Sequence, residues 1–272
     1  MTGIEIDAAA RMARVAPGVT WAEFDEATQE HGLAVTGARV SGLSVADAAL
    51  GDGSGWLERS LGTTGASLIE VGEDVVTLRL HAVGPTLLCG FLGFPRDRAA
   101  EVARTYRDLM ATAPDALGGG LLLGAGLGGV CNIVVCHLGP VEDGERVIAP
   151  LRELGPSLDA LAPNPYRAFQ RMWDDSHPEG TREHVRRAYV SELTDARLDA
   201  VVERANLPAA SLSYVFLRPL GGAVTHPHAT WACECVGLWP PVPALDPGQI
   251  AWVDGLAEAV APHAVDAATM RA

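Results

Sequence analysis

The chain has 272 residues, of which 48% are hydrophobic and 20% charged, a composition that predicts a globular protein with a substantial core. Its formal net charge of −14 argues against nucleic acid and anionic membrane surfaces as partners, because phosphate groups are bound by clustered Lys and Arg. The start shows no secretion signal, and no apolar run approaches the roughly twenty residues of a membrane span. We therefore expect a cytoplasmic protein whose partner is a small molecule or another protein.

Local patterns predict alternating helices and strands. A helix is expected from Trp21 to His31, because Thr20 and Glu23 form a capping-box pattern ahead of an apolar stripe. Two strands, 74–83 and 86–94, are expected to be joined at Gly84-Pro85. The remaining expected elements are helix 96–113, hairpin 121–138, helices 142–154 and 165–174, strand 185–190, helix 194–206, strands 211–218 and 231–239, and a helix from 246. This order favours an α+β fold with an antiparallel sheet and helices on one face.

Two stretches carry a family resemblance. Residues 45–62 read VADAALGDGSGWLERSLG, and the stretch before them ends in GARVSGLS; later segments include LHAVGPTLLCGFLGF and SLSYVFLRPLGGAV. Together they resemble FAD-linked oxidases of the PCMH-type, berberine-bridge-enzyme-like family. The resemblance implies a remnant of the FAD-binding domain over residues 1–67 and an antiparallel-sheet substrate domain over 68–272. It also implies oxidase or dehydrogenase activity, often on bulky natural products.

The sequence departs from that family where the flavin is held. The family's earlier Gly-rich segment, which ends in a His, precedes the position at which this sequence begins. Gly65 occupies the position of a Cys that tethers the flavin in some members, and only six residues separate Ser67 from Asp74, where the family has a long stretch. Asp47 and Asp52 replace glycines, and two like charges ~4 Å apart repel by about 4 kcal/mol at intermediate dielectric. We therefore expect no bound cofactor, with noncovalent FAD as the alternative.

If FAD is retained, the resemblance places its contacts in one loop. The implied cofactor-binding residues are Gly51, Gly53, Gly55 and Trp56. The other Gly-rich run, residues 118–129, contains a GxGxxG-like string, but a strand pattern follows it where a nucleotide site needs a helix. We interpret that run as a hairpin turn.

Candidate catalytic residues lie on the last two predicted strands. Glu234 lies between Cys233 and Cys235 on an apolar strand, so it faces the side opposite the cysteines, where burial would raise its pKa toward the range of a general acid. Tyr214 alternates with Phe216 and Arg218, so the three share one face. The expected catalytic residues are Glu234 and Tyr214, and the expected substrate-binding residues are Phe216, Arg218, His137 and Trp231. We expect no metal site, although His226 and His228 lie near the cysteines in sequence.

Three functions follow as hypotheses. The first is a cofactor-independent cyclase or isomerase that keeps the substrate chamber and orients a bulky, apolar, polyketide-like intermediate of secondary metabolism. The second is an FAD-dependent oxidoreductase with noncovalent flavin. The third is a non-catalytic binding subunit. A homodimer or a partner chain is compatible with each of them.

Overall fold

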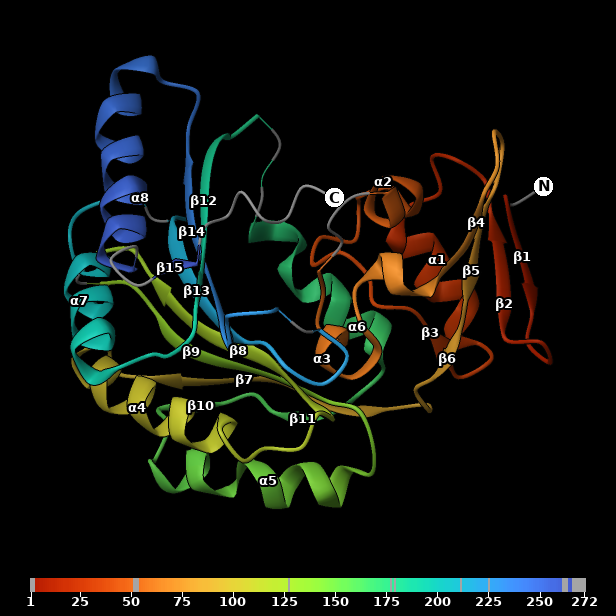
Figure 1. Cartoon of the computed structure of the whole chain (residues 1–272), viewed down its shortest axis with the longest axis horizontal. Helices are drawn as coiled ribbons and strands as arrows, with labels where there is room; N and C mark the ends of the chain where they lie inside the picture. The colour runs from red at the N-terminus through yellow and green to blue at the C-terminus, as the bar shows by residue number, and fades with distance from the viewer. Residues whose placement is uncertain are drawn as a thin grey trace.

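The protein consists of a small N-terminal sheet with its helices and a large sheet that forms the rest (Figure 1). This computed structural model describes residues 3–50, 54–126, 128–176, 178, 180–210, 212–224, 226–260 and 264–265. The small sheet is antiparallel, in the order β1-β2-β5-β4, and a separate two-stranded pair joins β3 to β6. The bounds of these strands are β1 (Ile4–Asp7), β2 (Met12–Val15), β3 (Leu33–Ala34), β4 (Leu68–Val71), β5 (Val76–Arg79) and β6 (His81–Ala82).

Helix α1 (Trp21–Gln29) begins where the sequence predicted. The Thr20 hydroxyl accepts from the backbone N–H of Glu23, and the Glu23 carboxylate accepts from the backbone N–H of Thr20, which completes the capping box. Trp21 and Phe24 are buried against the small sheet. Two short helices and one 3-10 turn follow, α2 (Val45–Leu50), α3 (Glu58–Leu61) and η1 (Thr64–Ser67).

The large sheet has nine antiparallel strands in the order β10-β7-β9-β8-β13-β14-β12-β15, with β11 also paired to β7. β8 and β9 form the predicted hairpin, but residues 118–124 of the Gly-rich run belong to strand β8 and only its last part lies in the connection, with Leu127 outside the described residues. The strands are β7 (Leu87–Phe94), β8 (Leu117–Gly124), β9 (Cys131–His137), β10 (Leu158–Asp159), β11 (Ala162–Asn164), β12 (Arg182–Val190), β13 (Tyr214–Pro219), β14 (Trp231–Trp239) and β15 (Ala264–Val265).

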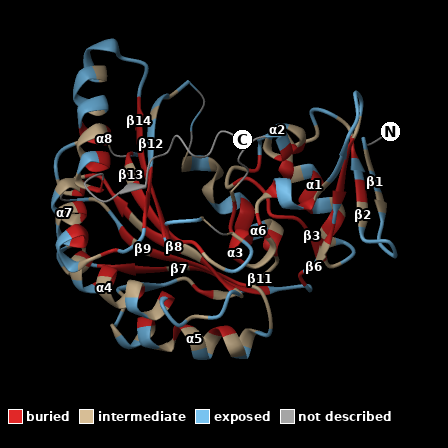
Figure 2. Ribbon diagram, in the orientation of Figure 1, coloured by how far each residue is buried: buried red, intermediate tan, exposed pale blue. Residues whose placement is uncertain are grey.

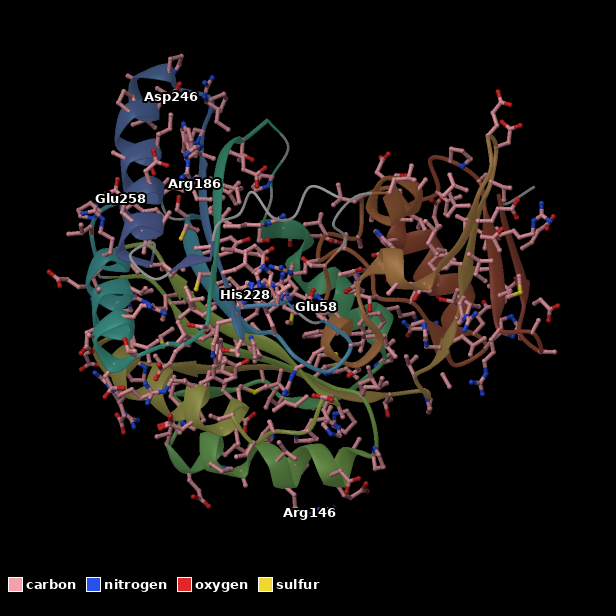
Figure 3. All side chains as sticks on the ribbon, in the orientation of Figure 1. Glu58, Arg146, Arg186, His228, Asp246 and Glu258 are labelled. Atoms are coloured by element: carbon pink, nitrogen blue, oxygen red, sulfur yellow. The ribbon has the colours of Figure 1, made fainter. Side chains whose placement is uncertain are left out.

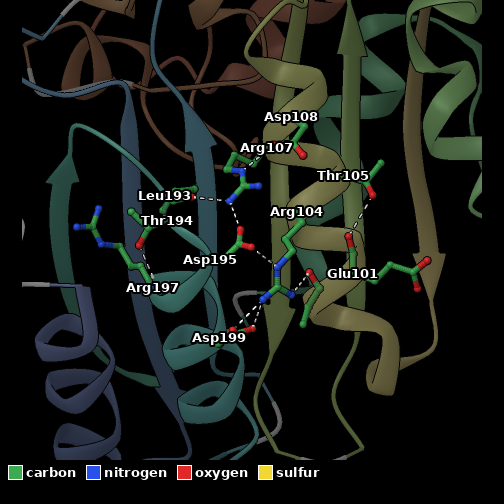
Figure 4. A network of polar contacts seen from close by, with 11 residues as sticks. Glu101, Arg104, Thr105, Arg107, Asp108, Leu193, Thr194, Asp195, Arg197 and Asp199 are labelled. Atoms are coloured by element: carbon green, nitrogen blue, oxygen red, sulfur yellow. Dashed lines mark hydrogen bonds and ion pairs between the residues drawn. The ribbon is translucent and has the colours of Figure 1, made fainter.

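Four helices cover one face of the large sheet and share its main core, as Figure 2 shows by their buried inner sides. They are α4 (Ala99–Met110), α5 (Val141–Glu153), α7 (Asp195–Ala205) and α8 (Asp246–Val260), with 3-10 turns η2 (Arg96–Arg98) before α4 and η4 (Pro243–Leu245) before α8. Ion pairs join two of these helices: Arg104 Nη2 lies 2.7 Å from Asp199 Oδ1, and Arg107 Nη1 lies 2.5 Å from Asp195 Oδ1 (Figure 4).

The opposite face of the large sheet packs against the N-terminal half. A second core cluster unites Trp56 and Leu57 with Phe216 of β13 and with Tyr166 and Phe169 of α6 (Tyr166–Gln170). The turn η3 (Arg171–Ser176) continues from α6. The sheet is therefore covered on both faces, and residues of the N-terminal half contribute to the cover of this second face.

The α+β fold with an antiparallel sheet is confirmed; four helices cover one face, and α6 packs on the other. The expected pairing of 74–83 with 86–94 is wrong, because β5 pairs with β2 and β4 while β7 pairs with β9. The change of sheet occurs between Arg79 and Leu87, so the small sheet extends beyond residue 67. The domain boundary at 67/68 stays a prediction. In the described part of the chain, no helix has the length and apolar character needed to cross a membrane.

A close backbone contact fixes how the N-terminal half folds on itself, and it gives a first test. A Cβ added at Gly55 would lie 1.8 Å from the carbonyl oxygen of Gly37. Because that oxygen belongs to the backbone, it cannot move aside as a flexible side chain would. We expect Gly55→Ala to lower the free energy of unfolding by about 3 kcal/mol or more in chemical denaturation. Gly248→Ala in α8 is the control, because nothing lies within 4 Å of its added Cβ. Equal stability of the two variants would refute the contact.

Candidate functional site

Two adjoining recesses lie between residues 38–48, Ser54 and Trp56 and the side of β12, β13 and β14 that faces away from the main core. The first, here the aromatic recess, measures about 660 Å³ including its open mouth. The second, here the acidic recess, measures about 970 Å³ on the same basis. Arg39, Val40 and Tyr214 line both. The aromatic recess is also lined by Trp56, Leu122, Gly124, Val130, Trp173, Ser176, Leu212, Ser213 and Phe216, and the acidic recess by Ala38, Leu43, Asp47, Ala48, Ser54, Glu183, Val185, Arg187, Glu234 and Val236.

The side chains predicted to share a face of β13 do so. Phe216 is paired in register with Glu234 of β14, and residues directly opposite in an antiparallel pair point to the same side of the sheet. Arg218 reaches Glu234 along the same face, since its Nε lies 3.1 Å from Glu234 Oε1. The expected catalytic pair, Tyr214 and Glu234, therefore meets at one site, together with Phe216 and Arg218.

Arg39 connects the N-terminal half to this face. Its Nη2 donates to Glu234 Oε1 at 2.8 Å and to Ser54 Oγ at 3.1 Å. The guanidinium carbon lies 4.8 Å from the centre of the Phe216 ring and 5.7 Å from that of Trp56, within the range of cation–π contacts. The guanidinium is thus held by a carboxylate on one side and by two aromatic rings.

A second arginine continues the chain of charges. Arg218 donates to Glu234 and also to Glu58 of α3, so positive and negative groups alternate in the order Arg39, Glu234, Arg218, Glu58. Glu58 lies between the large sheet and the N-terminal half (Figure 3). The last three side chains are at most 8% exposed, and Arg39 is 17% exposed. A buried ionic group needs such partners, because its lost hydration is otherwise uncompensated.

The two carboxyl groups of this chain differ in acidity. Burial by itself raises the pKa of Glu234, but the Arg39 and Arg218 guanidiniums outweigh it and lower that pKa to about 2. The expected raised pKa of Glu234, and with it a general-acid role, is wrong, since the sequence could not show the two arginines. Burial raises the pKa of Glu58 despite its contact with Arg218.

Tyr214 lines both recesses, together with Arg39 and Val40. Burial raises its pKa to about 12, although Arg39 nearby acts in the opposite direction. Its hydroxyl is therefore protonated at neutral pH and can donate a hydrogen bond or a proton.

Two residues predicted to bind substrate lie elsewhere. His137 is buried on β9 and packs on α5, where a Cβ added at Gly144 would lie 3.0 Å from its Cγ. Burial lowers the pKa of His137. Trp231 lies three residues before Glu234, so it faces the helices on the other side of the sheet and contacts Tyr106 at 6.1 Å between ring centroids. Neither lines the aromatic or the acidic recess, so the structure does not bring these two residues together with Tyr214 and Glu234.

The predicted cofactor residues give a mixed result. Gly51 and Gly53 lie outside the described residues. Gly55 packs directly on the backbone of Gly37, and Trp56 forms a wall of the aromatic recess. Cys233 and Cys235 are buried in the helical core, and the described residues contain no cluster of three or more side chains suited to a metal ion.

Sequence reasoning missed Arg39, Glu58 and Trp173. Arg39 lies inside the GARVSGLS motif, but its partner is 195 residues away. Glu58 follows the GWL motif, and its partner Arg218 is 160 residues away. Trp173 contacts Trp56 at 5.4 Å between ring centroids, from a turn that carries no recognisable motif. The motifs that signalled the family contain two of these three residues.

Comparison with known proteins supports the same scaffold. A family model described as an FAD binding domain matches residues 1–76. An FAD-linked oxidoreductase of Dictyostelium discoideum is 22% identical over 263 residues, which cover 84% of this chain. The chain spans 57% of the length of that curated relative.

Solved structures show the fold. The 6-hydroxy-D-nicotine oxidase of Arthrobacter nicotinovorans superposes with a TM-score of 0.81 and 17% identity, over 97% of this chain and 70% of that one. The BBE-like protein 28 of Arabidopsis thaliana superposes with a TM-score of 0.83 and 15% identity, over 97% of this chain and 67% of that one. A variant of berberine bridge enzyme superposes with a TM-score of 0.79 and 14% identity, over 97% of this chain and 65% of that one. The predicted resemblance to PCMH-type, berberine-bridge-enzyme-like FAD oxidases is confirmed, and the chain has their fold.

These comparisons make FAD a candidate cofactor, and the expectation that none is bound lacks their support. The described residues suit only part of the FAD molecule. The aromatic recess suits a flat ring, but Asp47, Glu183 and Glu234 line the acidic recess against two guanidiniums, Arg39 and Arg187, that already have protein partners. A pyrophosphate needs unopposed positive charge or a row of N–H donors. The described lining does not provide it.

The ion-pair chain predicts a pH dependence of stability. Because the folded pKa of Glu234 lies below its ordinary value, the stabilisation is complete above about 4.5 and is lost as the pH falls toward about 2. We expect Glu234→Gln to lower the free energy of unfolding by about 3–5 kcal/mol at neutral pH, because two buried guanidiniums lose their partner. The difference from wild type should shrink between pH 4.5 and 2 in denaturant titrations. Exposed Glu142→Gln is the control; a gap that is constant with pH contradicts the assignment.

Proposed function

We propose that the protein is a cofactor-independent cyclase or isomerase that binds a bulky, mainly apolar, carbonyl-bearing small molecule of the polyketide type in the aromatic recess. The observation that carries the proposal is the guanidinium of Arg39, held over Phe216 and Trp56 in a recess that also contains the Tyr214 ring. An apolar, concave surface with few convergent polar groups is the usual form of a small-molecule site. The walls would hold the ligand in one conformer, which accelerates an intramolecular reaction.

Arg39 supplies the positive charge for the reaction. In a ring closure, an enol carbon attacks a carbonyl carbon within the same molecule, and the carbonyl oxygen becomes negative as the new C–C bond forms. A fixed guanidinium stabilises that oxygen without reorganising, and its charge is weakly screened beside two aromatic rings. Glu234 and Arg218 act through Arg39, because they fix where its guanidinium lies.

Tyr214 supplies the proton. With a pKa of about 12, it can protonate the new alkoxide and regain a proton from the enol hydroxyl. The C–C bond forms at the expense of the C=O π bond, and the product has the mass of the substrate. The reaction therefore uses no oxidant.

An FAD-dependent oxidoreductase of secondary metabolism is the second candidate, favoured by the FAD binding domain match over residues 1–76 and by the fold. The flat aromatic recess would then accept the ring system of the cofactor, which supplies redox chemistry when bound. The acidic lining of the second recess does not suit the rest of the cofactor, because a pyrophosphate bound in that recess would meet three carboxylates.

Turnover tests the first candidate. Purified protein mixed with linear poly-β-carbonyl compounds, without oxidant, should give products of unchanged mass and new chromatographic position. We expect Arg39→Met to lower kcat by roughly 10²–10³-fold and Tyr214→Phe by roughly 10²-fold. Tyr106→Phe is the control, because it removes a buried hydroxyl on the helical side of the sheet, where no described partner binds it. Products lighter by two hydrogens would instead support the oxidoreductase.

Cofactor binding is measured separately. We expect colourless protein and no change in Tm on adding FAD, because a ligand stabilises by RT ln(1 + [L]/Kd) only if it binds the folded state. Yellow protein as purified, or stabilisation by roughly 2 kcal/mol or more at saturating FAD, would establish the second candidate.

A further inference from the structure

The charges lining the two recesses differ. Among the described residues of the aromatic recess, Arg39 is the only side chain with a formal charge. The carboxylates Asp47, Glu183 and Glu234 all line the acidic recess. A ligand body seated against Trp56 and Phe216 therefore meets one cation and no anion on its own side.

Arg39 retains donors for such a ligand. The hydrogen bonds that it makes to described residues all leave from Nη2, toward Glu234 and Ser54. Its Nε and Nη1 groups remain, and the side chain is 17% exposed, so it can be approached from the recess. A guanidinium carries five N–H donors and no acceptor, which restricts its partners to acceptor atoms.

Arg39 is the end of the ion-pair chain that lines the aromatic recess. Its carboxylate partner is shared, because Glu234 Oε1 also accepts from Arg218 Nε at 3.1 Å. Glu58, the second carboxylate of the chain, bonds to Arg218 and lies beyond it. The end of the ion-pair chain that faces the recess is thus the positive end.

We infer that the aromatic recess selects ligands whose aromatic or conjugated body carries an anionic oxygen, such as a carboxylate or the enolate of a β-dicarbonyl, and that Arg39 is the residue that selects them. This rests on the proposed function only in that the aromatic recess is the ligand site. A cationic ligand would meet Arg39 at close range in an apolar setting, where like charges repel strongly. A neutral ligand would leave the remaining N–H groups of Arg39 without a charged acceptor, and charge-assisted hydrogen bonds are the stronger ones.

Three naphthyl probes that differ in charge test the inference on the intact chain: 2-naphthoate, 2-naphthalenemethanol and 2-naphthylmethylammonium. Calorimetric titration at neutral pH should show naphthoate binding at least about tenfold more tightly than the alcohol, and the ammonium most weakly. In Arg39→Met the three affinities should come within roughly threefold of one another. Arg104→Met, which removes an ion-paired arginine on the helical side of the sheet, should leave the wild-type order intact.

A second variant locates the probes. Phe216→Ala should weaken the binding of naphthoate and of the alcohol by similar factors, because it removes the aromatic wall that both probes contact and leaves Arg39 in place. The inference would be overturned, and the proposed ligand site kept, by any of three results. These are equal affinities of the three probes for wild type, tightest binding of the ammonium, or an unchanged preference for naphthoate in Arg39→Met. Failure of all three probes to bind wild type would overturn both. A preference for naphthoate that Phe216→Ala does not weaken would place the anion site outside the aromatic recess and overturn the inference alone.

Discussion

Four charged side chains determine how the two halves of the molecule sit against each other. Arg39 and Glu58 belong to the N-terminal half, Arg218 and Glu234 to adjacent strands of the large sheet, and each charge has its partner across that boundary. Breaking one buried pair leaves an uncompensated charge, so sliding one half over the other is strongly disfavoured. The recesses are shaped by this alignment, because Arg39, one of the residues that line both, is fixed by it.

Backbone contacts refine the same arrangement. Gly118 of β8 admits the carbonyl of Trp56 at a distance where an added Cβ would lie 2.4 Å from that oxygen. This places the Trp56 ring against the sheet, where it contacts Phe216 at 6.1 Å between ring centroids. The ion pairs thus set the register of the two halves, and the glycine contacts set the spacing. The aromatic wall and the guanidinium above it follow from both.

Local signals in the sequence predicted much of the fold. The capping box gave the start of α1, and the alternation around Glu234 and Tyr214 placed both on one face of the sheet. Pairing could not be predicted in the same way: β5 and β7 are neighbours in sequence but join different sheets. The predicted direction of the Glu234 pKa shift was wrong for the same reason. The strand pattern around Glu234 indicates its burial, whereas Arg39 comes from a segment 195 residues away in sequence. The periodicity of the sequence predicts which side chains share a face of a strand, whereas the acidity of a side chain depends on partners that are distant in sequence.

The scaffold and the site carry different information about function. Structures with TM-scores near 0.8 share only 14–17% identity with this chain, so the likeness shows the fold and says nothing of the side chains at the site. A common fold by itself leaves the reaction open, so function has to be argued from the site. In this chain the aromatic recess holds a guanidinium tied to a carboxylate of pKa about 2, with an acidic recess next to it. Any ligand that binds there must accommodate a fixed positive charge at the boundary between an apolar and an acidic surface, and this electrostatic constraint narrows the chemistry further than the fold does.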